Sequence, residues 1–401
     1  DLFAYRKLQD TAADCEDRCD QIEREMRDPK AAERFALKQS QAFVDQMEGF
    51  ALELEDELMN FSDVSYKSFV KSESEIITLF YDKFADIPLL SRMDAVAETF
   101  IDEIETLLNR DLPEEERIPL IEKFRKMYET MDFYVLYNRF LKKEGYQTLP
   151  RRPLEKRKLR YEDVYPVLYL KYRLSRQAER SNIKHLVIDE MQDYSRLQYL
   201  IIRRIFSCKM TILGDRAQTM ADQQQDVLQF LPGIFGKDLR RIEMRKSYRN
   251  TVEIASYAAN LIGVTDLELF ERHGMPVLER DVTDLEAALR EAVDTLFPEE
   301  KTYETAAVIV PDEKTAERAY LILREILAEK DFDCEKRLSW LNRDSSSFKK
   351  GLTVTTFYLA KGLEFDQVFS IFPKDEKREM MMQAQYIAAT RALHELRVYH
   401  I

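Results

Sequence analysis

The sequence predicts an α/β protein with two parallel-sheet lobes and a long, acidic, mostly helical N-terminal region. Three observations lead to this prediction. Residues 43–61 and 93–110 space their apolar side chains at helical intervals, with acids between them. Short apolar runs at 185–190 and 209–215 flank a helical stretch, which is the pattern of a βαβ unit. A second set of such runs lies within 305–372.

Length and charge restrict the class of protein. A chain of 401 residues is too long for one compact core and favours two or three domains. The net charge is −13, and residues 1–150 alone sum to −14, so the remainder is close to neutral. Because nucleic-acid binding relies on Lys and Arg, the first part is a poor DNA surface. An acidic face suits a basic protein partner, or it simply keeps a helical surface solvated.

Cysteine usage and hydropathy indicate the compartment. No apolar run approaches the roughly 18 residues that cross a bilayer, so we expect no membrane segment. The four cysteines, at positions 15, 19, 208 and 334, have neither a second close pair nor a histidine cluster, and we expect no zinc. Free cysteines and a charged surface suit a reducing cytoplasm.

Changes in composition and in the spacing of apolar residues along the chain predict three parts. Residues 1–130 read as a helical arm, residues 131–245 as an α/β segment, and residues 246–401 as a second α/β lobe. The second lobe is expected to close with a helix over 383–396, followed by the short run 397–401.

The first apolar run ends in two acids, Asp189 and Glu190, and the next ends in Gly214 and Asp215. Ligands of parallel α/β sheets bind beyond the carboxyl ends of the strands. A nucleotide hydrolase needs an acid that holds Mg²⁺, a base that orients the attacking water, and cations near the γ-phosphate. Asp189 and Glu190 could supply the first two. A strand that ends in acids is also a common way to begin a helix, so this pair alone is a loose indication.

Five blocks follow one another along the chain. They are DEMQD (189–193), LGDRAQ (213–218), MRKSYRNTVEI (244–254), TFYLAKGLEFDQVF (356–369) and QYIAATRAL (385–393). In this order they resemble motifs II to VI of superfamily 1 helicases of the UvrD/Rep/PcrA type. The resemblance implies two RecA-like lobes, the first incomplete in this chain, and it implies ATP with Mg²⁺ as the nucleotide.

Within the first lobe, the resemblance implies four roles. Asp189 would hold Mg²⁺ and Glu190 would be the catalytic base. Gln218 would sense the γ-phosphate, and Asp215 would belong to the nucleotide-binding set.

The second lobe would contribute four more residues. Tyr248 would stack on adenine, Glu364 would contact the ribose, and Arg249 and Arg391 would reach the γ-phosphate. Two arginines from another segment complete the charge cage only when the two halves close, which would couple hydrolysis to domain motion. An arginine considered alone is more often part of a surface ion pair.

The sequence departs from these helicases in three places. It contains no G-x-x-x-x-G-K-[ST] phosphate loop (Walker A), and its only Gly-Lys pair is Gly236–Lys237. We expect the loop to lie upstream, and we expect the chain alone to bind ATP weakly. The stretch QTMADQQQD (218–226) lacks the aromatics that stack on single-stranded DNA, and Tyr358 replaces the motif V histidine.

These departures, together with the acidic helical block, resemble the HelD group of helicase-like ATPases from Gram-positive bacteria. That likeness implies core RNA polymerase as the partner, residues 1–130 as an arm that enters its DNA channel, and ATP turnover that releases the polymerase from nucleic acid. Two other hypotheses stay open. One is a UvrD-like DNA helicase or translocase, and the other is a non-catalytic binding protein of the same fold.

Overall fold

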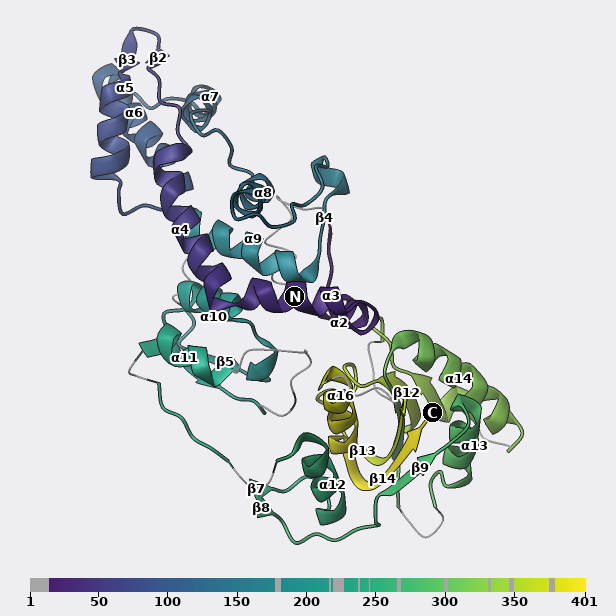
Figure 1. Ribbon diagram of the computed structural model, residues 1–401. Helices are drawn as coiled ribbons and strands as arrows, with labels where there is room; N and C mark the ends of the chain where they lie inside the picture. The colour runs from purple at the N-terminus through teal and green to yellow at the C-terminus, as the bar shows by residue number, and fades with distance from the viewer. Residues whose placement is uncertain are drawn as a thin grey trace. The chain divides into compact units, whose positions relative to one another are not determined.

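The computed structural model describes most of the chain (Figure 1). The described residues are 14–176, 182–215, 218, 227–236, 239–244, 246–264, 268–298, 302–330, 333–345, 350–374 and 379–401. The chain divides into two compact units. Unit 1 comprises Asp1–Asp189, Tyr194–Leu213 and Gln225–Asp238, and unit 2 comprises Glu190–Asp193, Gly214–Gln224 and Leu239–Ile401.

Unit 1 is mainly helical. Its elements in chain order are β1 (Asp14–Cys15), α2 (Arg18–Arg27), α3 (Pro29–Gln39), α4 (Gln41–Glu57), β2 (Val64–Tyr66), β3 (Phe69–Lys71), α5 (Glu73–Thr78), η1 (Leu79–Lys83), η2 (Leu89–Ser91), α6 (Arg92–Leu108), α7 (Glu114–Arg125), α8 (Phe133–Lys143), η3 (Leu154–Lys156), β4 (Lys158–Leu159), α9 (Tyr161–Leu174), β5 (His185–Ile188), α10 (Arg196–Ile205), β6 (Lys209–Ile212) and α11 (Val227–Phe235).

The two long amphipathic segments form helices as predicted. The helix α4 covers most of 43–61, and its first turn is capped by Ser40, whose side chain accepts from Phe43 N–H. The helix α6 covers 93–108 and ends where Asn109 adopts a left-handed backbone, a common way to end a helix. The mostly helical N-terminal region is thereby confirmed.

A short hairpin interrupts the helices of this region. The strands β2 and β3 pair antiparallel, and Lys67 in their turn has a φ of +53°. Hairpin turns favour a positive φ because it matches the twist of the strands.

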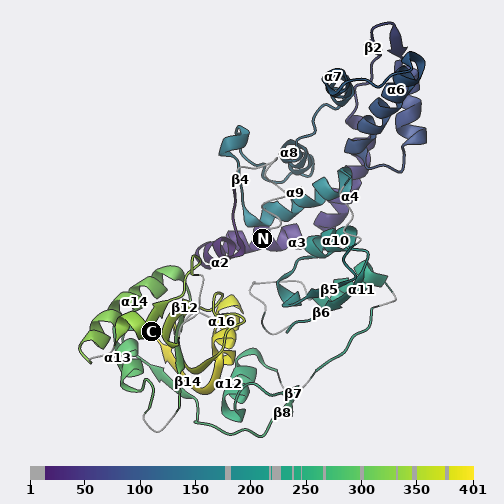
Figure 2. The same ribbon diagram turned by 180° about the vertical axis from the view of Figure 1, so that it is seen from behind.

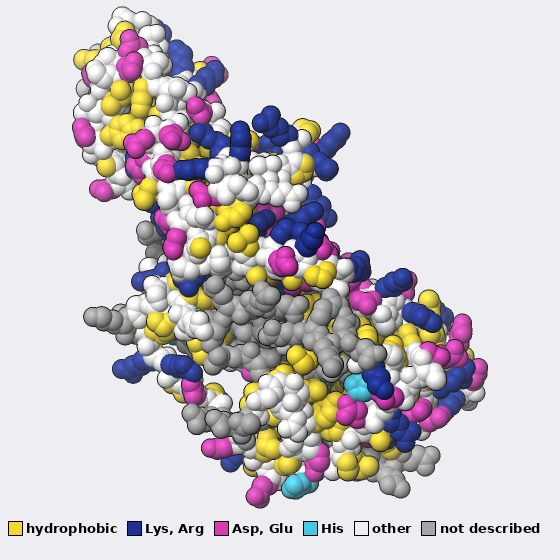
Figure 3. Space-filling view, in the orientation of Figure 1, with side chains coloured by type: hydrophobic (Ala, Val, Ile, Leu, Met, Phe, Trp, Pro, Cys, Tyr) yellow, Lys and Arg dark blue, Asp and Glu magenta, His cyan; other side chains and the backbone are white. Residues whose placement is uncertain are grey.

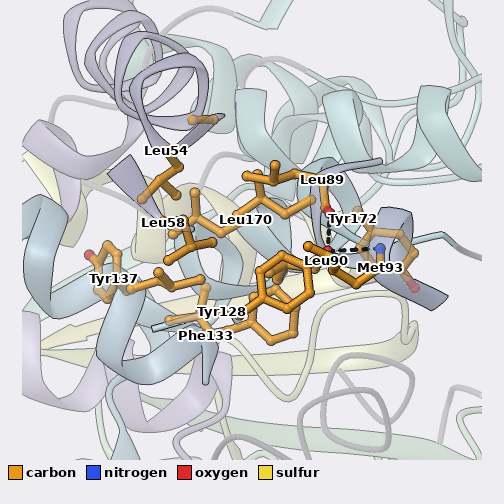
Figure 4. Packing of buried hydrophobic residues seen from close by; sticks show 14 of the residues in the cluster. Leu54, Leu58, Leu89, Leu90, Met93, Tyr128, Phe133, Tyr137, Leu170 and Tyr172 are labelled. Carbon is orange, nitrogen blue, oxygen red and sulfur yellow. Dashed lines mark hydrogen bonds between the residues drawn. The ribbon is translucent and has the colours of Figure 1, made fainter. Parts of the chain in front are cut away.

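One hydrophobic core holds unit 1 together. Figure 4 shows Leu54, Leu58 and Leu170 in this core, together with Tyr128. The Tyr128 hydroxyl donates to the Leu89 carbonyl oxygen and accepts from Met93 N–H at 3.3 Å, so this buried polar group is satisfied.

The acidic strand tip belongs to a two-stranded parallel sheet. The strands β5 and β6 pair in register, His185 with Lys209 through Ile188 with Ile212, and they lie side by side in Figure 2. The helix α10 connects them, which is the βαβ unit that the sequence predicts. A capping box begins this helix, because the Ser195 and Gln198 side chains each bond to the backbone N–H of the other.

Unit 2 is built on a parallel sheet. Its elements are η4 (Met191–Asp193), β7 (Lys246–Ser247), α12 (Val252–Ile262), β8 (Glu268–Leu269), β9 (Leu278–Asp281), α13 (Leu285–Asp294), β10 (Thr305–Val310), α14 (Glu313–Ala328), α15 (Cys334–Arg337), β11 (Leu338–Trp340), β12 (Gly351–Thr356), β13 (Phe365–Phe372), α16 (Glu379–Thr390) and β14 (Ala392–His400).

The main sheet of unit 2 has six strands in the order β11-β12-β10-β13-β14-β9, and all of its described pairings are parallel. Figures 1 and 2 show α13 and α14 on one face and α12 and α16 on the other. Strands covered on both faces are expected to be apolar throughout, as in the buried run Ala306–Val310 of β10. The α/β fold class is thereby confirmed.

The end of the second lobe differs from the prediction. The sequence favours a helix over 383–396, but α16 ends at Thr390 and β14 begins at Ala392. Pairing of β14 with both β13 and β9 overrides the helical preference of the RALHEL stretch, because strand order is a tertiary property. The first strand residues lie within the predicted helix.

Within the described residues, no helix combines the length and apolarity needed to cross a bilayer.

Candidate functional site

The segment after β5 holds two of the predicted site residues. Asp189 is exposed and Glu190 is half-buried. Glu190 has a φ of +53°, a left-handed backbone that costs a non-glycine residue on the order of 1–3 kcal/mol. Its carboxylate accepts a hydrogen bond of 2.7 Å from the side-chain amide of Gln192.

The segment after β6 is held closely against the segment after β5. A Cβ added to Gly214 would lie 2.5 Å from Met191 Cγ and 2.6 Å from its backbone nitrogen, so only glycine fits there. Asp215 N–H donates to Gln192 Oε1 at 3.1 Å. The buried amide of Gln192 thus links Glu190 to this second segment.

Gln218 occupies a junction of hydrogen bonds in unit 2. Its side-chain amide donates to Asp215 Oδ2 at 2.9 Å, and its Oε1 accepts from an Arg391 guanidinium nitrogen at 2.9 Å. Asp215 also lies 3.5 Å from the Tyr386 hydroxyl, whose pKa is raised by burial and then by the charge of Asp215. These contacts bring together three residues that the sequence assigns to the site: Asp215, Gln218 and Arg391.

Arg391 follows the last turn of α16 and is 1% exposed. Its guanidinium also donates to the carbonyl oxygens of Ile387 and Leu363, at 3.2 and 3.3 Å. Burial, and then repulsion from Arg249, lowers the pKa of Arg391 to about 10. The side chain therefore still carries its charge at neutral pH, and this buried cation is suited to an anionic ligand.

Arg249 and Glu364 form an ion pair. Arg249 Nε lies 2.6 Å from Glu364 Oε1, and both side chains are partly exposed. After burial, the charge of Arg249 is the next cause that lowers the pKa of Arg391. The two predicted arginines and the predicted ribose contact are therefore electrostatically linked.

Tyr248 has a separate environment. It is 61% exposed, and its ring lies 5.6 Å from that of Phe270, with Lys246 Nζ 5.5 Å from the Tyr248 ring centroid. An exposed aromatic face beside a cation can accept a flat π system. Among the described residues, no hydrogen bond or ring contact joins Tyr248 to Gln218 or Arg391.

Lys361 is a site residue that the sequence prediction missed. Its side chain is 6% exposed, and its ammonium lies 2.6 Å from Asp193 Oδ2 and 3.4 Å from Glu190 Oε2. It also donates to the Gln218 backbone carbonyl at 3.0 Å. Lys361 lies in the stretch LAKGLEF, directly after Leu359 and Ala360. These two apolar neighbours are the indication in the sequence that this lysine is buried.

The carboxylates of the site indicate whether Mg²⁺ with a nucleotide could bind there. Asp189 offers an exposed carboxylate, the ligand type that Mg²⁺ prefers. No cluster of three or more His, Cys, Asp or Glu side chains suited to a metal is present in the described ranges. Mg²⁺ commonly binds through one or two carboxylates and the substrate phosphates, so a single acid is compatible with that ion. Most of the QTMADQQQD stretch lies outside the described residues.

The fold and the site define a parallel α/β protein with a charged, strand-end site in which arginine, lysine and carboxylates meet. The sequence profile of the UvrD/REP helicase N-terminal domain matches residues 3–220. The chain therefore belongs to the UvrD/REP helicase family.

Comparison with solved structures found helicases at low similarity. The C-terminal domain of a possible DNA helicase from Lactobacillus plantarum WCFS1 has 23% identity and a TM-score of 0.30, over 39% of this chain and 88% of that one. The PRRSV helicase has 14% identity and a TM-score of 0.30, over 67% of this chain and 45% of that one. The arterivirus nonstructural protein 10 (helicase) in complex with DNA has the same identity and TM-score, and the chain spans 51% of it. No curated protein sequence matches the chain.

Proposed function

We propose that the chain is part of an ATP-hydrolysing superfamily 1 helicase-like protein. The observation that carries the proposal is the junction at Gln218, where one amide joins Asp215 to the buried cation of Arg391. The Arg391 guanidinium could exchange its hydrogen bond with the Gln218 amide for one with a γ-phosphate. Its positive charge would then neutralise the negative charge that develops on this phosphate during hydrolysis.

The roles of the acids follow from their positions. Asp189 would hold Mg²⁺, and Glu190 would accept the proton of the attacking water. The different surroundings of the two acids support this division of roles, because Asp189 is exposed whereas Glu190 is half-buried and bonded to Gln192. Asp215 would hold the Gln218 amide toward the phosphate.

The remaining residues would bind the nucleotide. Tyr248 would stack on adenine, Glu364 would contact the ribose, and Arg249 would reach the γ-phosphate with Arg391. The Arg249–Glu364 ion pair would have to open for both side chains to reach their ligands. Nucleotide binding would therefore exchange one ion pair for two ligand contacts.

Hydrolysis is tested by substitution in the full-length protein. Glu190→Gln should abolish ATP turnover and leave nucleotide binding intact, and Arg391→Ala should lower turnover by about 10²-fold or more, as for arginine fingers. Arg290→Ala is the matched control, since Arg290 forms a surface pair with Glu286 in α13. Turnover by Glu190→Gln near the wild-type rate would contradict the assignment of Glu190 as the base. Absence of ATP turnover by the wild-type protein would favour a non-catalytic binding protein.

We propose that the full-length protein is a HelD-type factor and that its partner is core RNA polymerase. It would use ATP to release the polymerase from nucleic acid. Residues 1–130 would be the arm, residues 131–245 the rest of the first lobe, and residues 246–401 the second lobe. The acidic charge of residues 1–150 supports the arm, since a channel built for DNA attracts negative charge.

A DNA translocase of the UvrD type is the second candidate, and membership of the UvrD/REP family favours it. The two candidates separate by partner. Capture of core RNA polymerase by the full-length protein, with ATPase activity indifferent to DNA, supports the first. ATPase activity stimulated by single-stranded DNA, without polymerase capture, supports the second.

A further inference from the structure

Arg391 is held by its backbone as well as by its guanidinium. Figure 3 shows Lys and Arg side chains at the surface of unit 2, spread among acidic ones, whereas Arg391 is 1% exposed. Its N–H donates to the Ala388 carbonyl at 3.2 Å, and its own carbonyl accepts from Phe365 N–H at 2.9 Å. Since a buried side chain has little space in which to move, the direction of this arginine depends on where its backbone is fixed.

A buried asparagine fixes the backbone on both sides of Arg391. Asn250 is 7% exposed, and its side-chain amide donates to the Thr390 carbonyl at 3.2 Å and to the Ala392 carbonyl at 2.6 Å. The two bonds need both N–H groups of one amide. An aspartate has no such donor at neutral pH and a serine has only one, so asparagine is suited to bridging two carbonyls at this distance.

The same asparagine joins Arg391 to the segment that carries the other arginine of the site. Asn250 directly follows Arg249 in the chain and directly precedes the residue that caps α12. That cap is Thr251, whose side chain accepts from Ile254 N–H. Because the start of α12 fixes the backbone of Asn250, its amide holds the two carbonyls from an anchored position.

A second side chain joins the same two segments. The guanidinium of Arg272 donates to the Arg249 carbonyl and, at 2.7 Å, to the Leu393 carbonyl. The Arg272 carbonyl in turn accepts from Val252 N–H at 2.9 Å. The backbone at Arg249 is therefore linked twice to the residues around Arg391, once through an amide and once through a guanidinium.

We propose that Asn250 is a positioning residue, which acts on hydrolysis through Arg391. The inference rests on the proposed function, because that function gives Arg391 its place at the γ-phosphate. A cation stabilises developing charge best when it is placed in advance, since reorientation during the reaction would cost part of the stabilisation. Asn250 supplies this placement by holding the chain before and after Arg391.

ATP turnover by the full-length protein tests the proposal. Asn250→Leu keeps the approximate size of the side chain and removes both donors. It should lower kcat by about 10- to 100-fold, as a displacement of about 1 Å does, and leave KM within about threefold. Asn260→Leu is the matched control, because Asn260 is exposed near the end of α12, and it should leave both constants unchanged.

A second variant guards against failure to fold. Asn250→Ser keeps one donor and should lower kcat by about threefold. The fluorescence of Trp340, which lies in β11 of unit 2, shows whether each variant is folded. If Asn250→Leu does not fold, Asn250→Ser takes its place in every comparison.

A double-mutant cycle separates positioning from a general structural effect. In an Arg391→Ala background, Asn250→Leu should change kcat by less than about threefold, because the residue through which it acts is gone. The same loss in both backgrounds, or a kcat of Asn250→Leu equal to that of the wild type, would overturn the proposal and leave ATP hydrolysis established. A wild-type protein without ATP turnover would instead overturn the proposed function, and this inference with it.

Discussion

Lys361 allows a sharp test of the site in the absence of nucleotide. Its ammonium contacts Asp193, Glu190 and the Gln218 carbonyl, and only 6% of its side chain is exposed. Lys361→Met keeps the length of the side chain and removes the charge. Breaking a fully buried pair costs about 3–5 kcal/mol. Asp193 and Glu190 keep 21% and 36% exposure, so solvent screens them, and we expect a loss of about 2 kcal/mol.

The assay uses the single tryptophan, Trp340, which lies in β11 and therefore reports on unit 2. A loss of this size should lower the thermal midpoint followed by its fluorescence by about 4–8 °C. A double-mutant cycle with Asp193→Asn should show coupling of about 1–2 kcal/mol. The surface pair Lys350–Glu304, 74% and 62% exposed, is the control and should show at most about 0.5 kcal/mol. An equal midpoint shift for Lys361→Met and Lys350→Met would refute the reasoning.

Three further predictions concern stability. Gly214→Ala would place a methyl group 2.5 Å from Met191 Cγ, and it should destabilise unit 2 by about 1–3 kcal/mol, measured by the same fluorescence. Burial alone would raise the pKa of Glu162, but its hydrogen bond and ion pair with Arg24 outweigh burial and hold that pKa below 4.5. A carboxyl group whose pKa is lower in the folded state stabilises the fold at pH values above its pKa in the unfolded chain. Unit 1 should therefore unfold at a lower urea concentration, followed by circular dichroism, as the pH falls below about 4.5. A constant midpoint across that range would contradict the assignment. Phe140 is 0% exposed, and Phe140→Ala should cost about 3–5 kcal/mol by the same method.

Periodicity predicted most of the regular structure. The run that became β10 is apolar and buried from Ala306 to Val310, as expected of a strand that is covered on both faces. The runs that became β5 and β6 are partly exposed and include His185, Lys209 and Thr211. The β2–β3 hairpin was not predicted, because each strand has only three residues and both lie between strong helical patterns. The end of α16 was misplaced because the sequence does not state which strands β14 joins.

The site was predicted in part for a similar reason. The order of the five blocks selected Asp215, Gln218 and Arg391, and these three are in contact. The roles of all eight assigned residues stay predictions until turnover is measured. Lys361 lies within the fourth block, but the sequence alone predicts no role for it, since its burial depends on Asp193, Glu190 and the Gln218 carbonyl from distant parts of the chain. The left-handed backbone of Glu190 is likewise a property of the fold alone.

The place of β14 in the sheet of unit 2 has a consequence for biosynthesis. This strand lies between β13 and β9, yet it is made after both of them. At a translation rate of about 5–20 residues per second, on the order of ten seconds pass between the synthesis of β9 and that of its neighbour β14. Once β13 has been made, it presents an open edge of buried-type residues until β14 follows, and this edge invites pairing with other nascent chains. Slower translation would lengthen the exposure, so the yield of native protein should depend on how fast residues 392–400 are delivered.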